Sequence, residues 1–361
     1  MRRIVMAVVL LACSGLQAQQ MKTFVVAQRR EGVIEFIDPV TLATVSRIHF
    51  DVRSTSGLNG VAASRDGARL YVEGPITGHE SPGGCCYLYS IDLAALQAKK
   101  VAGIGGTHSQ AAFVVSNGIV YQMSEIFARG GSEGTGGGVA FLDPTGHYLF
   151  RVRSSHGPAL DVYDLAQGTG VRRLAPTGLD GQWFTSGAWS GNRFFLYATR
   201  DDGSAARLWT VSATAAELGP GVAVKPFGQI PGCSKVRLKE ITAAGGNLFV
   251  YERFGTKLDR REFCGSKIPG GAWVVDPDTG QPLHHYAPEL HFAALIADRT
   301  EPVLYGLAAE GSTTWKAPVK LVRMDARNGR VLQSRYLDVD YWWITVAPLQ
   351  KAPTGEVQVV P

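Results

Sequence analysis

The chain lacks any stretch with the apolar periodicity of an α-helix. Its apolar residues alternate with polar ones, or form short runs between Gly, Pro, Asn and Asp, which is typical of many short β-strands. Beyond residue 20 there is also no apolar run long enough to cross a bilayer as a helix. These two absences favour an all-β fold.

Charge and catalytic motifs are also scarce. Charged residues make up 19% of the chain, and the formal net charge is only +5. Because no run of basic residues is present, we expect no nucleic-acid partner. The sequence has no serine nucleophile elbow and no HExxH pair, and the glycine-rich stretch 130–138 lacks the Lys-Ser/Thr ending of a phosphate loop.

Cysteine is rare, and four of the five cysteines lie beyond residue 20. In an exported protein disulfides are the default, and four cysteines allow three connectivities. Cys233 and Cys264 lie in loop-like sequence, and we favour a bond between them, which leaves Cys85 and Cys86 as a vicinal pair. A zinc site is the alternative, although no CxxC spacing is present.

The first 20 residues have the pattern of a secretory signal rather than of folded structure. Arg2 and Arg3 precede an apolar run of nine residues, and Ala18 ends a plausible cleavage site. A second interpretation is a lipoprotein box that ends at Cys13, which would become a lipidated N-terminus. We therefore expect a periplasmic or secreted protein, with a lipid-anchored protein as the alternative.

One phrase recurs along the chain: a short apolar strand ends in Asp, turns on small or polar residues, and is followed by a second strand. Copies spaced by multiples of roughly fifty residues indicate a repeat architecture. The four copies centre on Asp38, Asp92, Asp276 and Asp325.

A second hairpin alternates with this phrase, and the two together make a four-stranded antiparallel meander. Repeated meanders of this kind are the blades of a β-propeller. Small residues suit the crowded inner strands, which we expect near residues 60, 111, 187, 241, 293 and 344. The spacing predicts seven blades, one of them abbreviated between residues 109 and 175; six blades with an insertion is the alternative.

The two ends of the propeller region, residues 21–349, complement each other. The run 342–347 resembles an inner strand without a following partner, and residues 23–27 resemble a second strand without a first. Paired, they would complete one blade from both termini and remove exposed sheet edges. Residues 350–361 are predicted to be a C-terminal tail.

These repeats resemble those of the bacterial propellers with Tyr-Val-Thr-Asn repeats, and of the related large chain of quinoprotein amine dehydrogenases. The resemblance covers about residues 22–349 and rests on the Ile-Asp-Pro and Asp-Pro-Asp-Thr-Gly phrases and the split closing blade. It implies a scaffold or binding surface, because in those dehydrogenases the quinone is on a separate small chain. The motifs are structural and carry over no catalytic residue.

Propellers commonly bind ligands where the inner strands start. Polar side chains near those starts that would suit a divalent cation, as in the metal-dependent propeller lactonases, are Glu240, Asn59, His108 and His291. Lys239, Tyr341 and Trp343 are further candidates for binding a ligand. His284 and His285 are neighbours on one predicted strand, where side chains face opposite ways, so we do not expect one metal to take both.

The sequence therefore predicts an exported β-propeller that acts as a binding or scaffold module. Its partner would be another exported protein or a small molecule at one mouth of the channel. The alternatives are a metal-dependent, lactonase-like hydrolase and the cofactor-free large subunit of a quinoprotein amine dehydrogenase.

Overall fold

The computed structural model describes most strands and part of their connections. The described residues are 22–29, 32–50, 60–64, 67–74, 87–103, 113–116, 119–122, 140–142, 148–153, 159–164, 171–174, 182–190, 193–200, 207–211, 221–224, 239–252, 270–298, 300–310, 319–337 and 341–359. Every regular element among them is a β-strand.

Three sheets contain the strands β1 to β9. The first combines β1 (Lys22–Arg29), β2 (Val33–Ile37) and β3 (Thr44–Phe50) with two strands from the other end, β26 (Tyr341–Leu349) and β27 (Gly355–Val359). The second contains β4 (Gly60–Ala63), β5 (Arg69–Gly74), β6 (Tyr87–Asp92) and β7 (Gln97–Gly103). The third contains β8 (Phe113–Ser116) and β9 (Ile119–Gln122).

The remaining four sheets each contain four strands in chain order. One contains β10 (Ala140–Leu142), β11 (Tyr148–Arg153), β12 (Ala159–Asp164) and β13 (Val171–Leu174), and the next contains β14 (Gln182–Ser190), β15 (Arg193–Arg200), β16 (Arg207–Val211) and β17 (Val222–Ala223). The third contains β18 (Lys239–Ala244), β19 (Asn247–Glu252), β20 (Ala272–Val275) and β21 (Pro282–Tyr286). The fourth contains β22 (Leu290–Ala297), β23 (Val303–Glu310), β24 (Val319–Asp325) and β25 (Val331–Leu337).

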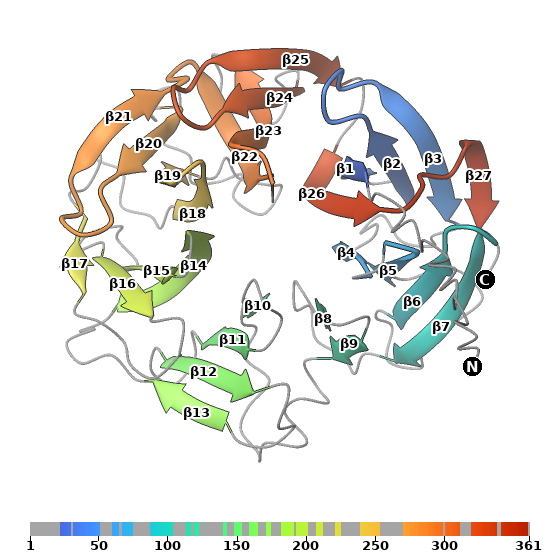
Figure 1. Cartoon of the computed structure of the whole chain (residues 1–361), viewed down its shortest axis with the longest axis horizontal. Helices are drawn as coiled ribbons and strands as arrows, with labels where there is room; N and C mark the ends of the chain where they lie inside the picture. The colour runs from blue at the N-terminus through green and yellow to red at the C-terminus, as the bar shows by residue number, and fades with distance from the viewer. Residues whose placement is uncertain are drawn as a thin grey trace, which may run out of the picture.

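The sheets are arranged radially around a common centre (Figure 1). Each presents one edge strand to the centre and the other edge strand to the rim. The strands nearest the centre, here called inner strands, are β4, β8, β10, β14, β18, β22 and β26. This radial repetition of antiparallel meanders is the β-propeller architecture expected from the sequence. The rim strands β21 and β25 carry mostly exposed side chains.

The first and last parts of the chain meet in one sheet. β1 pairs antiparallel with β26, with Val25 opposite Val346, so the predicted pairing of residues 23–27 with 342–347 is present. A further strand was not anticipated: β27, within the predicted tail, pairs in parallel with β3 at the rim edge of this sheet. The segment 350–354 crosses from β26 to β27, and the buried side chain of Ala352 packs into the adjacent core.

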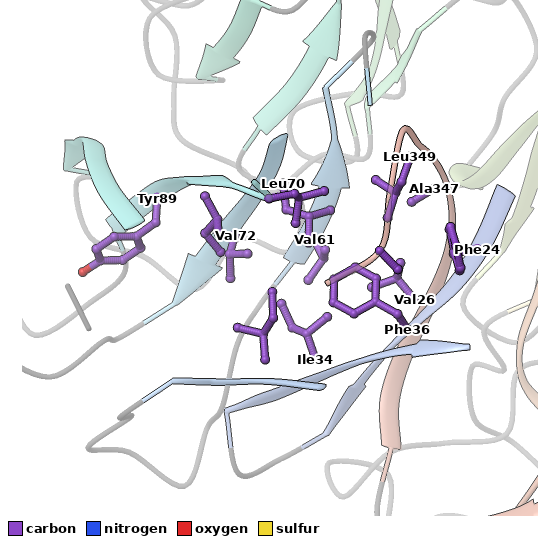
Figure 2. Packing of buried hydrophobic residues seen from close by; sticks show 14 of the residues in the cluster. Phe24, Val26, Ile34, Phe36, Val61, Leu70, Val72, Tyr89, Ala347 and Leu349 are labelled. Atoms are coloured by element: carbon purple, nitrogen blue, oxygen red, sulfur yellow. The ribbon is translucent and has the colours of Figure 1, made fainter. Parts of the chain in front are cut away.

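The hydrophobic core is divided among the gaps between sheets. One cluster fills the gap between the sheet of both termini and the β4–β7 sheet, where Phe36 and Val26 face Val61 and Leu70 (Figure 2). Equivalent clusters join β10–β13 to β14–β17, β14–β17 to β18–β21, β18–β21 to β22–β25, and β22–β25 to the sheet of both termini. Among the described residues, the sheet of both termini and the sheets β14–β17, β18–β21 and β22–β25 therefore each bury apolar side chains on both faces against their neighbours.

The Asp phrase forms the same turn in all four copies. In Asp38, Asp92 and Asp276 the carboxylate accepts the backbone N–H groups two and three residues later, at 2.8–3.1 Å. Asp325 accepts the N–H of Arg327 and also its guanidinium. The residue four positions after each Asp donates its N–H to the Asp carbonyl. These local bonds explain why the phrase ends one strand and begins the next.

The last residue of each turn adopts the left-handed backbone conformation. Leu42, Leu96, Gly280 and Gly329 have φ between 54° and 72°. Gly280 rests on the carbonyl oxygen of Ala223 in the preceding sheet, and a Cβ there would lie 2.3 Å from that oxygen. A Cβ on Gly329 would lie 2.2 Å from the ring of Tyr286, also in the preceding sheet. These two Asp turns thus also dock their sheets on the sheet before them.

A buried carboxylate lies between the β22–β25 sheet and the sheet of both termini. Glu35 is 1% exposed and accepts from Nε of Arg47 at 2.8 Å and from Thr44 at 3.1 Å. Arg335 of β25 approaches it to 3.8 Å and donates to Thr44. Arg47 also pairs with Glu356 of β27 at 2.9 Å, so four strands share one polar network. Such a charge is tolerated in a gap only when it is paired and hydrogen-bonded.

Candidate functional site

The starts of the inner strands form the candidate site. Because the sheets repeat the same strand order around the centre, their inner strands run in one direction and begin at the same end of the ring. We call this end, formed by the first residues of β14, β18, β22 and β26, the mouth. Loops and strand ends on a rigid scaffold are common positions for binding side chains.

Glu240, the second residue of β18, is held by a hydrogen-bond chain at the mouth. The hydroxyl of Tyr251 on β19 donates to Glu240 Oε2 at 2.5 Å, and the N–H of Leu295 on β22 donates to the same hydroxyl at 3.2 Å. Since Leu295 uses the tyrosine oxygen as acceptor, the tyrosine proton is directed at Glu240. The carboxylate is therefore oriented as an acceptor, half-buried between two sheets.

An irregularity in β22 makes this chain possible. The pairing of β22 with β23 shifts register between Phe292 and Ala294, which is the signature of a β-bulge. Tyr251 is only 3% exposed, and its ring meets Phe292 edge to face at 6.3 Å between centroids. The tyrosine is thus fixed by packing as well as by hydrogen bonds.

A similar link joins the preceding pair of inner strands. β14 also shifts register, between Phe184 and Ser186, and the buried hydroxyl of Ser186 accepts the N–H of Ile241 at 3.1 Å. In both links a side chain of one sheet satisfies a backbone N–H on the inner strand of the next. The start of β18 is therefore held by bonds to both neighbouring sheets.

His291 lies at the start of β22, but its side chain does not face Glu240. Phe292 packs into the gap toward β18–β21, and neighbouring residues on a strand face opposite ways. His291 therefore faces the gap toward the sheet of both termini. Burial lowers the pKa of His291 below its usual value of 6.5, which favours the neutral ring.

The other predicted site residues are placed only in part. Lys239 starts β18, and Tyr341 and Trp343 start β26, so their backbone lies at the mouth. Asn59, His108 and the four cysteines Cys85, Cys86, Cys233 and Cys264 lie outside the described residues, as does Cys13. Within the described part of the chain, no three His, Cys, Asp or Glu side chains gather as a metal site would require.

The neighbouring histidines of β21 face opposite ways, as expected. His285 stacks on Trp273 with centroids 3.7 Å apart, and its Nε2 lies 2.8 Å from the carbonyl oxygen of Gly270. His284 lies alongside Tyr286, with the rings nearly parallel. Both residues are on a rim strand, away from the mouth.

One residue of the site, Tyr251, was missed by the sequence analysis. Tyr251 is eleven residues from Glu240, and the two are opposite each other in the β18–β19 pairing. A polar aromatic at the end of an otherwise apolar second strand is the signal that would have drawn attention to it. The position of Ser186 near the start of an inner strand can be read from the sequence, but its partner cannot, because that partner is a backbone group of another sheet.

Comparisons with known proteins assign neither a family nor an activity to this chain. No family model matches the sequence, and the search of curated proteins gives no significant match. Among solved structures the chain is similar to a dihydro-heme d1 dehydrogenase, NirN, in complex with DHE, with 11% identity, 90% of this chain and 75% of that chain covered, and a TM-score of 0.48.

Two further structures show similar values. A nidogen/laminin complex matches with 12% identity over 90% of this chain and 98% of that chain, at a TM-score of 0.47. Apo AztD from Citrobacter koseri matches with 15% identity over 89% and 84%, at a TM-score of 0.44. These neighbours are β-propeller proteins.

Among the residues that the structure describes, no helix is long and apolar enough to span a membrane.

Proposed function

We propose that this chain is a binding module whose ligand docks at the mouth, with Glu240 as its main described polar contact. The observation that carries the proposal is the bond from Tyr251 to Glu240, supported in turn by Leu295. A half-buried carboxylate fixed in one orientation before binding loses little freedom when a ligand arrives. The ligand would present a hydrogen-bond donor or a positive charge, either an ammonium group or a divalent cation.

The proposed scaffold is a closed ring of seven blades, with β8 and β9 as an abbreviated blade. Support comes from the seven sheets of the described residues and from the contacts that link β4 to β8, β8 to β10 and β26 to β4. β1 and β26 would close the ring from both ends of the chain. A closed ring would leave no unpaired inner edge and would hold the mouth rigid.

We propose that the protein lies outside the cytoplasm, because its amino-terminal sequence has the pattern of a secretory signal. We also propose that Cys233 and Cys264 form a disulfide bond. The Asp phrases support a relationship between this chain and the propellers with Tyr-Val-Thr-Asn repeats. In that setting the partner would be an exported protein or a small molecule. A scaffold role and a binding role are compatible, because the mouth that would bind the ligand and the rim that keeps the sheets in place are separate parts of the propeller.

A ligand panel tests the proposal. Small primary and quaternary ammonium compounds would be screened by ligand-observed NMR, and Ca²⁺, Mn²⁺ and Zn²⁺ by calorimetry, against the native chain and the Glu240→Gln variant. The matched control is Glu301→Gln, which removes a carboxylate between β22 and β23 at the opposite end of the ring from the mouth.

We expect binding that Glu240→Gln abolishes and Glu301→Gln leaves unchanged. Binding of equal strength to the native chain and the Glu240→Gln variant would refute the role of Glu240. Cation binding that Glu240→Gln removes would favour the metal-dependent alternative. Ammonium binding without cation binding would favour a module that recognises amines.

A further inference from the structure

The connection between β26 and β27 is barely long enough to cross the sheet. β26 is the innermost strand of its sheet and β27 the outermost, so Gln350–Thr354 must pass β1, β2 and β3. Four spacings between neighbouring strands amount to about 19 Å. The six Cα–Cα steps from Leu349 to Gly355 span at most roughly 20–22 Å when fully extended. The crossing is therefore close to its greatest length.

The crossing is also held at its first half. The N–H of Gln350 donates to the carbonyl oxygen of Gly67 in the next sheet at 3.0 Å, and the side chain of Ala352 is 8% exposed. Pro353 is buried as well, so Thr354 is the one exposed residue between this buried part of the crossing and the edge of β3. A short, extended connection of this kind is the condition under which a terminal strand exchanges between copies of a chain.

The contacts that hold β27 are independent of the crossing. The ladder pairs Glu356 with Arg47 and Gln358 with His49, and it runs parallel to β3. Glu356 accepts from Arg47 at 2.9 Å and lies 3.8 Å from His49, while most side chains of β27 are exposed. A β27 strand supplied by another copy would make the same ladder and the same ion pair.

We propose that the rim edge of β3 is a strand-acceptor surface that binds β27 of a second copy of this chain. The exchange is reciprocal and gives a twofold dimer in which each copy completes the sheet of the other. The chain bends at Thr354, the exposed residue that precedes β27, so the rims of the two copies lie side by side. Glu356 of one copy then pairs with Arg47 of the other, which also holds the buried Glu35.

The oligomeric state of four chains tests this proposal, measured by size-exclusion chromatography with light scattering after incubation at high concentration. They are the native chain, a chain that lacks Thr354, a chain lengthened by Gly-Ser-Gly-Ser after Thr354, and the Thr354-deleted chain that also lacks residues 355–361. Thermal unfolding of each chain shows whether it is folded.

We expect a dimer fraction that rises with concentration for the native chain and is several-fold larger when Thr354 is deleted. The lengthened chain should be monomeric, because β27 then reaches its own β3 without tension. The chain without residues 355–361 should also be monomeric. A folded Thr354-deleted chain that stays monomeric, or one that dimerises without residues 355–361, would overturn the proposal.

A cross-link identifies the strand that is exchanged. A photoreactive benzophenone side chain at Gln358, which lies opposite His49 in the ladder, would be placed in both ¹⁴N- and ¹⁵N-labelled native chains. After the two preparations are mixed and incubated, the proposal requires cross-links between light and heavy chains at β3. Cross-links confined to light–light and heavy–heavy pairs within monomers would refute it.

Discussion

The sheets are joined in two different ways at the rim and at the mouth. At the rim the Asp turns repeat one geometry, and their left-handed residues Gly280 and Gly329 press against the preceding sheet. At the mouth the joints differ from one another: Ser186 receives a backbone N–H of β18, whereas Tyr251 bridges Glu240 and Leu295. Repetition at the rim holds the sheets in position, and variation at the mouth leaves room for a specific site.

The largest expected effect is at the rim. Gly329→Ala places a Cβ 2.2 Å from the Tyr286 ring at a φ of 72°, so the turn must shift or lose its backbone conformation. We expect the free energy of unfolding to fall by about 2–5 kcal/mol, from strain and overpacking together. Chemical denaturation measures it.

Gly246→Ala is the matched control for this change. Gly246 has a similar φ of 83°, but a Cβ there meets nothing within 4 Å. The control should lose only about 1 kcal/mol, the cost of the backbone conformation alone. Equal losses at Gly246 and Gly329 would show that docking on the preceding sheet contributes nothing at the rim.

The next largest effect is at the mouth. Tyr251→Phe keeps the ring but removes the hydroxyl, which leaves the Leu295 N–H and one Glu240 oxygen without this partner. We expect a loss of about 1–3 kcal/mol in the free energy of unfolding. A double-mutant cycle with Glu240→Gln should show coupling between the two positions; strict additivity would mean that the bond does not orient Glu240.

The pH dependence of the free energy of unfolding tests the charge in one Asp turn at the rim. The guanidinium of Arg327 lowers the pKa of Asp325 to about 2, from 3.8. The carboxylate therefore stabilises the fold fully above about pH 4, and this contribution is lost as the pH falls through 2. Asp325→Asn should reduce stability at neutral pH by about 1–2 kcal/mol, with the difference from the native chain shrinking as the pH falls and vanishing only below pH 2. A difference that is constant with pH would exclude a role for the charge.

The smallest effect concerns the exposed ion pair between two sheets. Arg193 of β15 pairs with Asp278 in the next Asp turn at 2.7 Å, and both side chains are well exposed. We expect Arg193→Gln to change stability by less than about 1 kcal/mol, since exposed pairs are weak. A larger loss in denaturation experiments would mean that this side chain acts through packing on Phe195, which it covers at 4.9 Å.

The rim was predictable from the sequence because its structure is local. An Asp side chain that accepts N–H groups two and three residues later needs no information from elsewhere in the chain. The exception is also informative, because Leu42 and Leu96 take the left-handed position that glycine takes in the other copies. Leu42 is fully buried against the preceding sheet, so its side chain compensates for the unfavourable backbone.

The mouth was predictable only as a set of candidate residues. Glu240 was identified from its place at the start of an inner strand, but its partners depend on strand register and on a bulge in another sheet. The two residues His291 and Glu240 were expected to converge because both lie near the starts of inner strands. The strand register turns the side chain of His291 away from Glu240. β27 escaped prediction because its parallel partner, β3, is about three hundred residues away in the chain.

The pairing of β1 with β26 has a consequence for how the protein is made. β1 leaves the ribosome long before its partner β26, so it waits for its neighbour while all the sheets between them are made. Glu35 waits equally long for Arg335, although Arg47 is near from the start. Such long-range contacts slow folding and leave a strand edge open to other chains. We expect the nascent amino-terminal strands to need protection until the chain is complete, so that the order of synthesis itself becomes part of the folding problem.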